Sequence, residues 1–207
     1  MLKAAYWTMG ALSLIIAAIQ LRFLFLPLPL ASPDMVHHVA DIAPVFWVHV
    51  IAAAWAMAAG VPQFSVRVRT AHPRIHRWTG RTYVAAVLLG GLSGLGLALN
   101  ANGGFVTQSG FSLLAVCWLI ATGMALRHVL AGRYADHRIW MIRSYALTFA
   151  AVTLRLQVPI WVNLLETDYT GVLPIIAWAC WVPNLIVAEW LIARRRSLPV
   201  PQTAGHA

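Results

Sequence analysis

Charged residues are scarce in this chain of 207 residues: they make up 10% of it, and only six are acidic. Soluble domains carry about 25% charged residues. The composition therefore excludes a soluble globular enzyme. It also excludes a disordered chain, because 60% of the residues are hydrophobic and disordered segments have too little apolar surface to bury.

Cysteine is nearly absent as well. Cys117 and Cys180 are the only two, each lies within an apolar run, and neither belongs to a CxxC or CxxCH motif. This excludes a disulfide-built secreted domain and argues against thiolate metal sites and covalently attached haem. The chain also has no HExxH motif, paired acids or serine–histidine arrangement, so no catalytic residue is predicted.

Long apolar runs, by contrast, are frequent. Six of them approach the roughly 20 residues that cross a bilayer as a helix, at about Ala4–Leu26, Ile42–Phe64, Thr82–Ala101, Phe111–Leu130, Trp140–Leu165 and Val172–Ala193. The first run follows Lys3 and could be a signal peptide, but it is long for one and the residues before Ser32 form a poor cleavage site. The sequence predicts an all-α membrane bundle of six transmembrane helices.

The connections between the runs alternate in charge. Two connections and the segment after the last run carry the arginines: Arg67, Arg69, Arg74, Arg77 and Arg81, then Arg127, Arg133 and Arg138, then Arg194, Arg195 and Arg196. The other connections carry Asp34 and Asp41, no charge, and Glu166 and Asp168. With six spans, all arginine-rich segments fall on one side, which predicts cytoplasmic termini and a multi-pass protein of a bacterial inner membrane.

The net charge of +9 fits this bias and an attraction to anionic lipid head groups. It does not predict nucleic-acid binding, because no long basic domain is present. Residues 1–198 are expected to form one transmembrane domain, and residues 199–207 a short disordered tail.

Histidines gather in the arginine-rich segments. His72 and His76 flank Pro73 where the third helix would begin, and His128 and His137 flank the start of the fifth. Two histidines at equal depth on facing helices can hold b-type haem, and nearby arginines could pair with its propionates. His76, His137, His72 and His128 are therefore candidate haem ligands. The alternative is a set of polar anchors at the lipid head groups.

Two further polar residues lie inside the spans. Arg155 falls near the middle of the fifth, where an arginine costs about 2.5–3.5 kcal/mol and usually faces protein or water. Its stripe, His137, Met141, Ser144, Thr148 and Ala151, should face the bundle interior. His49 lies at a similar depth in the second span. Together they predict an outward-facing polar pocket, joined by Gln157 or Asn163, for a small anionic ligand.

Three smaller structural predictions concern the ends and surfaces of helices. Asp136 is a plausible N-cap of the fifth span. Gly90 and Gly94 form a GxxxG pair that favours close helix packing. Glu189 is expected to pair with Arg143.

The residues from about Val45 to Leu191 resemble a family of predicted bacterial membrane proteins, domain of unknown function 2306. The matching elements are His49, the segment His72-Pro-Arg-Ile-His76-Arg-Trp-Thr-Gly80-Arg81, Ser93-Gly94, and the run from His137 through Arg143 to Arg155. The resemblance implies a helical membrane protein and no established activity. A looser, architectural likeness is to cytochrome b561-type proteins, which hold haem between histidines on neighbouring helices.

Three functions stay open from sequence alone. The first is a redox protein that holds b-type haem at the cytoplasmic side. The second is a carrier or binding protein for a small anionic solute that uses His49 and Arg155; the chain is short for a carrier unless it forms a homodimer. The third is an accessory protein that binds no ligand.

Overall fold

The computed structural model describes residues 2–27, 30 and 36–196, and it is helical throughout these ranges apart from short turns. Six helical segments are long and apolar enough to cross a membrane: Ala4–Phe25, Ile42–Phe64, Pro73–Leu99, Gly104–Leu130, Tyr134–Leu164 and Tyr169–Arg194. The six-span, all-α prediction is confirmed. The tail predicted for residues 199–207 lies outside the described residues.

The first three spans are built from α1 (Leu2–Gln20) with α2 (Arg22–Phe25), α4 (Val36–Gly60) with the 3-10 turn η2 (Val61–Phe64), and α6 (Pro73–Leu99). The short α5 (Val66–Ala71) joins η2 to α6. The fourth span is α7 (Gly104–Leu130), the fifth is α8 (Tyr134–Thr148) with α9 (Ala150–Leu164), and the sixth is α10 (Tyr169–Ala179) with α11 (Val182–Arg196).

The last four spans begin three to nine residues before the predicted apolar runs, because their polar first turns are already helical. Pro73 occupies the first turn of α6 after the N-cap His72, as the sequence suggested. The predicted cap Asp136 is wrong. The N-cap of α8 is Arg133, and Asp136 lies in the first turn instead.

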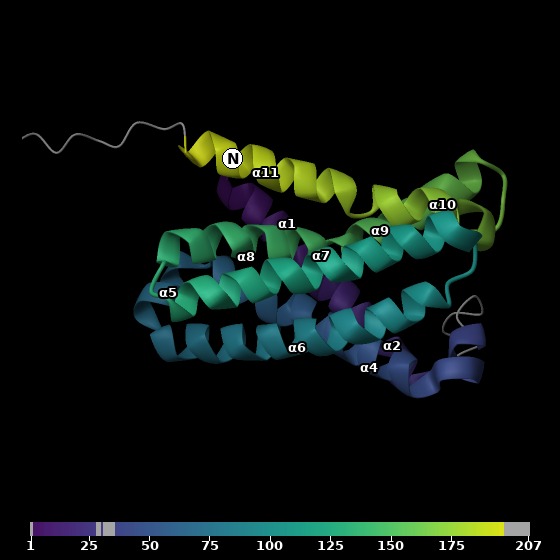
Figure 1. Cartoon of the computed structure of the whole chain (residues 1–207), viewed down its shortest axis with the longest axis horizontal. Coiled ribbons are helices and arrows are strands. Elements are labelled where there is room, and N and C mark those ends of the chain that lie inside the picture. The colour runs from purple at the N-terminus through teal and green to yellow at the C-terminus, as the bar shows by residue number, and fades with distance from the viewer. Residues whose placement is uncertain (1, 28–29, 31–35, 197–207) are drawn as a thin grey trace, which may run out of the picture.

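The spans pack as a bundle in which α4 lies against α6, and α7 lies against both α6 and α8 (Figure 1). The connection that contains α5, the turn between α7 and α8, and the far end of α11 all lie at one end of the bundle, on the left of Figure 1. The arginine-rich segments therefore share one end. Which membrane face this end meets remains a prediction from the arginine bias.

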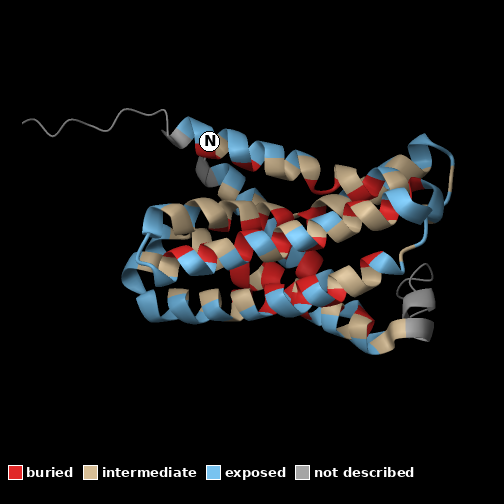
Figure 2. Cartoon of the chain, in the orientation of Figure 1, coloured by how far each residue is buried: buried red, intermediate tan, exposed pale blue. Residues whose placement is uncertain are grey.

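Buried residues concentrate along the middle of the bundle, whereas its outer surface is exposed (Figure 2). The core contains small side chains such as Ala56 and Ala125 beside the fully buried Tyr83. It also contains several buried hydroxyl side chains: Ser13, Ser93, Thr107, Thr122, Ser144 and Thr148. Outside the core, Arg143 pairs with Glu189 as predicted, through Nε to Oε1 at 2.6 Å and Nη2 to Oε2 at 3.0 Å, and ties α8 to α11.

Candidate functional site

A cavity of about 620 Å³ lies inside the bundle, toward the end opposite the arginine-rich connections. Residues of all six spans line it, and most of them are aliphatic or aromatic. Its polar lining consists of Gln20, Arg22, His49, Asn102, Trp118, Thr148, Arg155 and Tyr169. Small-molecule sites are typically about 300–1,000 Å³, mostly apolar, with a few polar groups that orient the ligand. The cavity has these properties.

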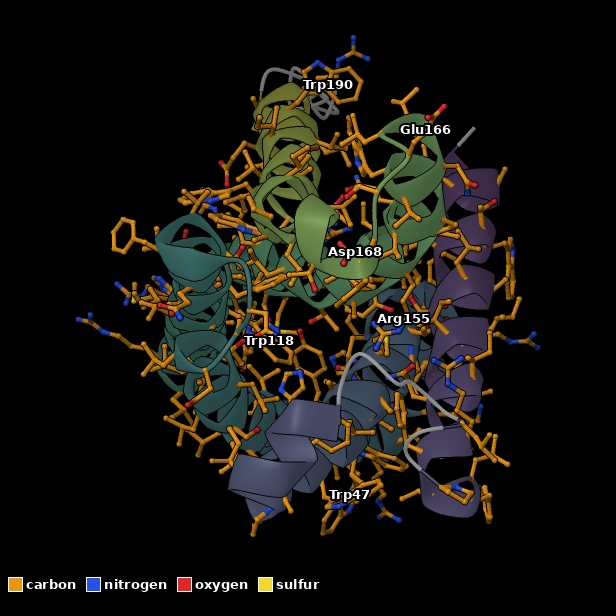
Figure 3. The ribbon with its side chains drawn as sticks, turned by 90° about the vertical axis from the view of Figure 1, so that its right-hand side faces the viewer. Trp47, Trp118, Arg155, Glu166, Asp168 and Trp190 are labelled. Atoms are coloured by element: carbon orange, nitrogen blue, oxygen red, sulfur yellow. The ribbon has the colours of Figure 1, made fainter. Side chains whose placement is uncertain are left out.

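Arg155 projects into this cavity from α9 (Figure 3, viewed from that end of the bundle). Its Nε donates to Gln20 Oε1 at 3.0 Å, and its Nη1 donates to the carbonyl of Ala151 at 2.7 Å. Both acceptors are neutral.

No acid compensates the charge of Arg155 among the described residues. None of the cavity-lining residues is an aspartate or glutamate, and both described ion pairs lie elsewhere. The two acids nearest to Arg155 in the sequence do not pair with it. Asp168 caps α10 by accepting a hydrogen bond from Gly171 N at 2.8 Å, and Glu166 lies well away from Arg155 (Figure 3). Tyr169 and Arg22 both line the cavity within electrostatic range of Arg155. Tyr169 acts favourably on the charge of Arg155, and the exposed Arg22 adds a second positive charge to the cavity wall.

His49 faces the same cavity from α4. Its Nδ1 lies 2.9 Å from the carbonyl of Gly90 on α6. Because a carbonyl only accepts, Nδ1 carries the proton and Nε2 of the neutral ring is an acceptor. The ring sits against Gly94, where a Cβ would lie 3.0 Å from His49 Cε1 and Nδ1. The Gly90–Gly94 pair therefore both anchors the imidazole and leaves room for it.

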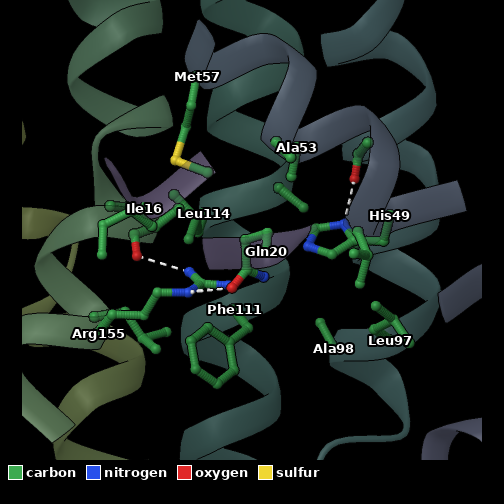
Figure 4. Close-up of a pocket in the computed structure, with 18 of the residues that line it drawn as sticks. Ile16, Gln20, His49, Ala53, Met57, Leu97, Ala98, Phe111, Leu114 and Arg155 are labelled. Atoms are coloured by element: carbon green, nitrogen blue, oxygen red, sulfur yellow. Dashed lines mark hydrogen bonds between the residues drawn. The ribbon is translucent and has the colours of Figure 1, made fainter. Parts of the chain in front are cut away.

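His49 and Arg155 thus line one cavity, and Gln20 lies between them (Figure 4). The other two candidates for this pocket do not join it: Gln157 Nε2 donates to the Ala179 carbonyl at 3.1 Å, and Asn163 Nδ2 to the Pro159 carbonyl at 2.6 Å. Sequence reasoning missed Gln20, although a buried amide inside the first span was a signal for it.

The four histidines proposed as haem ligands lie elsewhere, and none lines this cavity. His72 is exposed at the start of α6, and His128 Nδ1 lies 3.7 Å from Asp136 Oδ2. His137 Nδ1 binds the Ala125 carbonyl at 2.8 Å, and His76 is close enough to His137 to interact electrostatically. The described residues contain no group of three or more histidine, cysteine or acidic side chains able to hold a metal ion.

Comparison with known proteins agrees with this architecture. Residues 46–192 match the model of one family, described as predicted membrane protein (DUF2306). No curated protein and no solved structure matches the chain. The matched segment covers α6 to α10 completely, most of α4 and α11, and the positions of both His49 and Arg155. The chain therefore belongs to the DUF2306 family of predicted multi-pass membrane proteins.

Proposed function

We propose that this protein binds a small organic anion with an apolar body, in the cavity between His49 and Arg155, as a binding protein or carrier. The observation that carries the proposal is Arg155: a membrane-embedded guanidinium that faces a cavity with no acid among the described residues that line it.

The energetics favour an anionic ligand over an empty cavity. Two neutral acceptors solvate the guanidinium of Arg155 in part, and no acid that the structure describes compensates its charge. An anion about 4 Å from that charge gains about 4 kcal/mol at an effective dielectric constant of about 20. A guanidinium has five N–H donors, and the bonds to Gln20 and Ala151 use two of them. The side chain can therefore also donate charge-assisted hydrogen bonds to an anion in the cavity.

The rest of the cavity selects the shape of the ligand. Its wall is mainly apolar, with Phe111 and Leu114 near Arg155 (Figure 4), so the body of the ligand should be hydrocarbon. His49 Nε2 can accept a hydrogen bond from the ligand. Because both Arg155 and Arg22 line the cavity, a cation of the same size should bind more weakly than an anion.

Titration calorimetry of the purified protein with benzenesulfonate tests the proposal. This probe has a permanent charge and an apolar ring. A charge-assisted hydrogen bond contributes about 1.5–3 kcal/mol, so Arg155→Gln should weaken binding about 10- to 150-fold. Neutral benzenesulfonamide should not bind measurably. Phenyl phosphate shows whether the site also accepts phosphate monoesters.

Arg143→Gln is the matched control. It removes the same charge from the same span, but Arg143 pairs with Glu189 and does not line the cavity, so affinity should stay at the wild-type value. Failure of the wild type to bind either anion would refute the proposal and favour the accessory-protein hypothesis. Equal losses in both variants would refute a specific role for Arg155.

A second candidate function is haem binding between His76 and His137. The observation in its favour is the position of the two residues on α6 and α8 within electrostatic range of each other. In addition, the Nδ1 of His137 is held by the Ala125 carbonyl, which leaves its Nε2 for coordination, an arrangement typical of metal-binding histidines. A reduced-minus-oxidised absorption spectrum of protein expressed with added haem tests this. Sharp Soret and alpha bands that His137→Ala abolishes would support it, and a colourless protein would refute it.

A further inference from the structure

His49 is anchored through one ring nitrogen, and its other nitrogen faces the cavity. Nδ1 donates to the Gly90 carbonyl at 2.9 Å, and Gly94, which has no Cβ, leaves room for the ring beside α6. Nε2 lies on the side of the ring that points toward Gln20 and Arg155 (Figure 4). The imidazole is therefore held in place by an atom that does not face the ligand.

An anion in the cavity meets a mismatch at Nε2 of His49. In the neutral ring this nitrogen is an acceptor, and a sulfonate or carboxylate group also offers only acceptors, so the two repel each other. The neighbouring polar groups suit an anion. Arg155 carries only donors, and Gln20, whose Oε1 accepts from Arg155, has an amide N–H group as well. A protonated imidazole donates from both nitrogens, so protonation would make His49 suit the anion too.

The empty cavity disfavours the protonated ring. The described cavity-lining side chains that can ionise are Arg22, His49, Arg155 and Tyr169, and none of them is a carboxylic acid. His49 lies within electrostatic range of Arg155, so an imidazolium would face another positive charge in a medium of low dielectric constant. A bound anion compensates the charge of Arg155 and attracts the imidazolium. The Nδ1 bond to the Gly90 carbonyl forms in both states, so protonation at Nε2 breaks no hydrogen bond of the anchor.

We propose that His49 takes up one proton when the cavity binds an anion. The proton comes from water at the outer end, where the cavity is lined by the exposed Arg22 and by the exposed Asn102 between α6 and α7. One N–H bond forms at Nε2 and one O–H bond of a hydronium ion breaks, and the proton leaves by the same route when the anion dissociates. The site then binds an anion and a proton together. This inference rests on the proposed function.

Titration calorimetry of the full chain with benzenesulfonate tests the proposal at several pH values between about 6 and 8, the range in which histidine ordinarily titrates. Each titration is repeated in two amine buffers with different enthalpies of ionisation, because the difference in binding heat gives the number of protons taken up. Sulfonate buffers are avoided, since they carry the anionic group of the probe. Benzenesulfonate stays an anion throughout, so the protein must bind any proton that is taken up. We expect uptake that approaches one proton per bound anion, and a Kd that rises by up to about tenfold per pH unit.

His49→Asn removes the titrating group, while its amide can still donate to the Gly90 carbonyl. This variant should bind benzenesulfonate without proton uptake and with an affinity that does not depend on pH. His49→Gln provides the same test if His49→Asn does not fold. His72→Gln is the matched control, because His72 is exposed at the start of α6 and does not line the cavity. It should keep the proton uptake and the pH dependence of the wild type.

The two proposals fail separately. Benzenesulfonate binding to the wild type without proton uptake, and with a Kd that is independent of pH, would overturn the role of His49 and leave the anion site intact. Proton uptake that persists in both His49 variants would assign the proton to another group and would overturn that role as well. An absence of benzenesulfonate binding at every pH would refute the anion site itself, and the coupled proton uptake with it.

Discussion

Gly60, the last residue of α4, should not tolerate even a methyl group. It is buried, and a Cβ at this position would lie 2.6 Å from Tyr145 Cδ2 and 3.1 Å from Tyr83 Cε2. Carbon atoms in contact prefer about 3.5–4.0 Å, so the Tyr145 ring would have to move by about 1 Å. The close approach of α4 to α8 therefore depends on glycine here.

The Tyr145 ring has little room to move. Its hydroxyl donates to Ser13 Oγ at 2.9 Å and lies 3.2 Å from the Met57 carbonyl, and its ring packs edge-on against Phe64 with centroids 5.1 Å apart. Overpacking of a core typically costs about 1–3 kcal/mol. The higher helix propensity of alanine offsets at most about 1 kcal/mol of this cost. We expect Gly60→Ala to lower the free energy of unfolding by about 1–2 kcal/mol.

Titration from mild detergent into sodium dodecyl sulfate, followed by circular dichroism, measures this free energy. Gly123→Ala is the matched control, because Gly123 lies inside α7 with nothing within 4 Å of an added Cβ. It should stabilise by about 0.5–1 kcal/mol. A smaller side chain at position 145 should relieve the clash. The double variant Gly60→Ala, Tyr145→Leu should therefore lose less free energy of unfolding than the sum of the losses in the two single variants. Equal stability of Gly60→Ala and the wild type would refute the packing argument.

Two more predictions concern the site and the surface. Gly94→Ala should push the His49 ring away from the Gly90 carbonyl, because the new Cβ would lie 3.0 Å from that ring. The lost hydrogen bond is worth about 0.5–1.5 kcal/mol, so benzenesulfonate binding should weaken about 2- to 12-fold. Unchanged affinity would show that the position of the His49 ring does not affect binding. Glu189→Gln breaks the ion pair with Arg143, in which the Arg143 side chain is 22% exposed and the Glu189 side chain is 47% exposed. Pairs exposed to this degree contribute about 0.2–1 kcal/mol, so the free energy of unfolding in the same detergent titration should fall by that amount. A loss above about 2 kcal/mol would contradict this expectation.

Three features agree with predictions from sequence: the number of spans, the inward-facing stripe of the fifth span, and the position of His49 and Arg155 in one cavity. Each of these predictions depends on one helix at a time or on the depth of a residue in the membrane. Hydropathy predicts a span, and period 3.6 predicts its inner face. Met141, Ser144 and Thr148 are indeed buried. Other helix starts were predicted less well, because a polar first turn such as that of α8 carries no apolar signal.

What sequence could not supply is the rotation of each helix about its own axis relative to its neighbours. Tyr83 and Thr122 are single polar residues in apolar runs, and nothing in the pattern says that both reach Ser144. The partner of Arg155 was missed for the same reason. Gln20 is 135 positions away in the chain, and only the packing of α1 beside α9 brings the two side chains together.

The first span, α1 with α2, contributes to the cavity although the family match does not cover it. The family match begins at residue 46, beyond α1 and α2. Yet α1 supplies Gln20 to Arg155 and Ser13 to Tyr145, and α2 supplies Arg22 to the cavity wall. Arg155, its acceptor Ala151 and His49 lie within the matched segment, whereas Gln20 and Arg22 lie outside it. Under the proposed function, Arg155 of the matched segment binds the anion, and Gln20 of the first span orients Arg155.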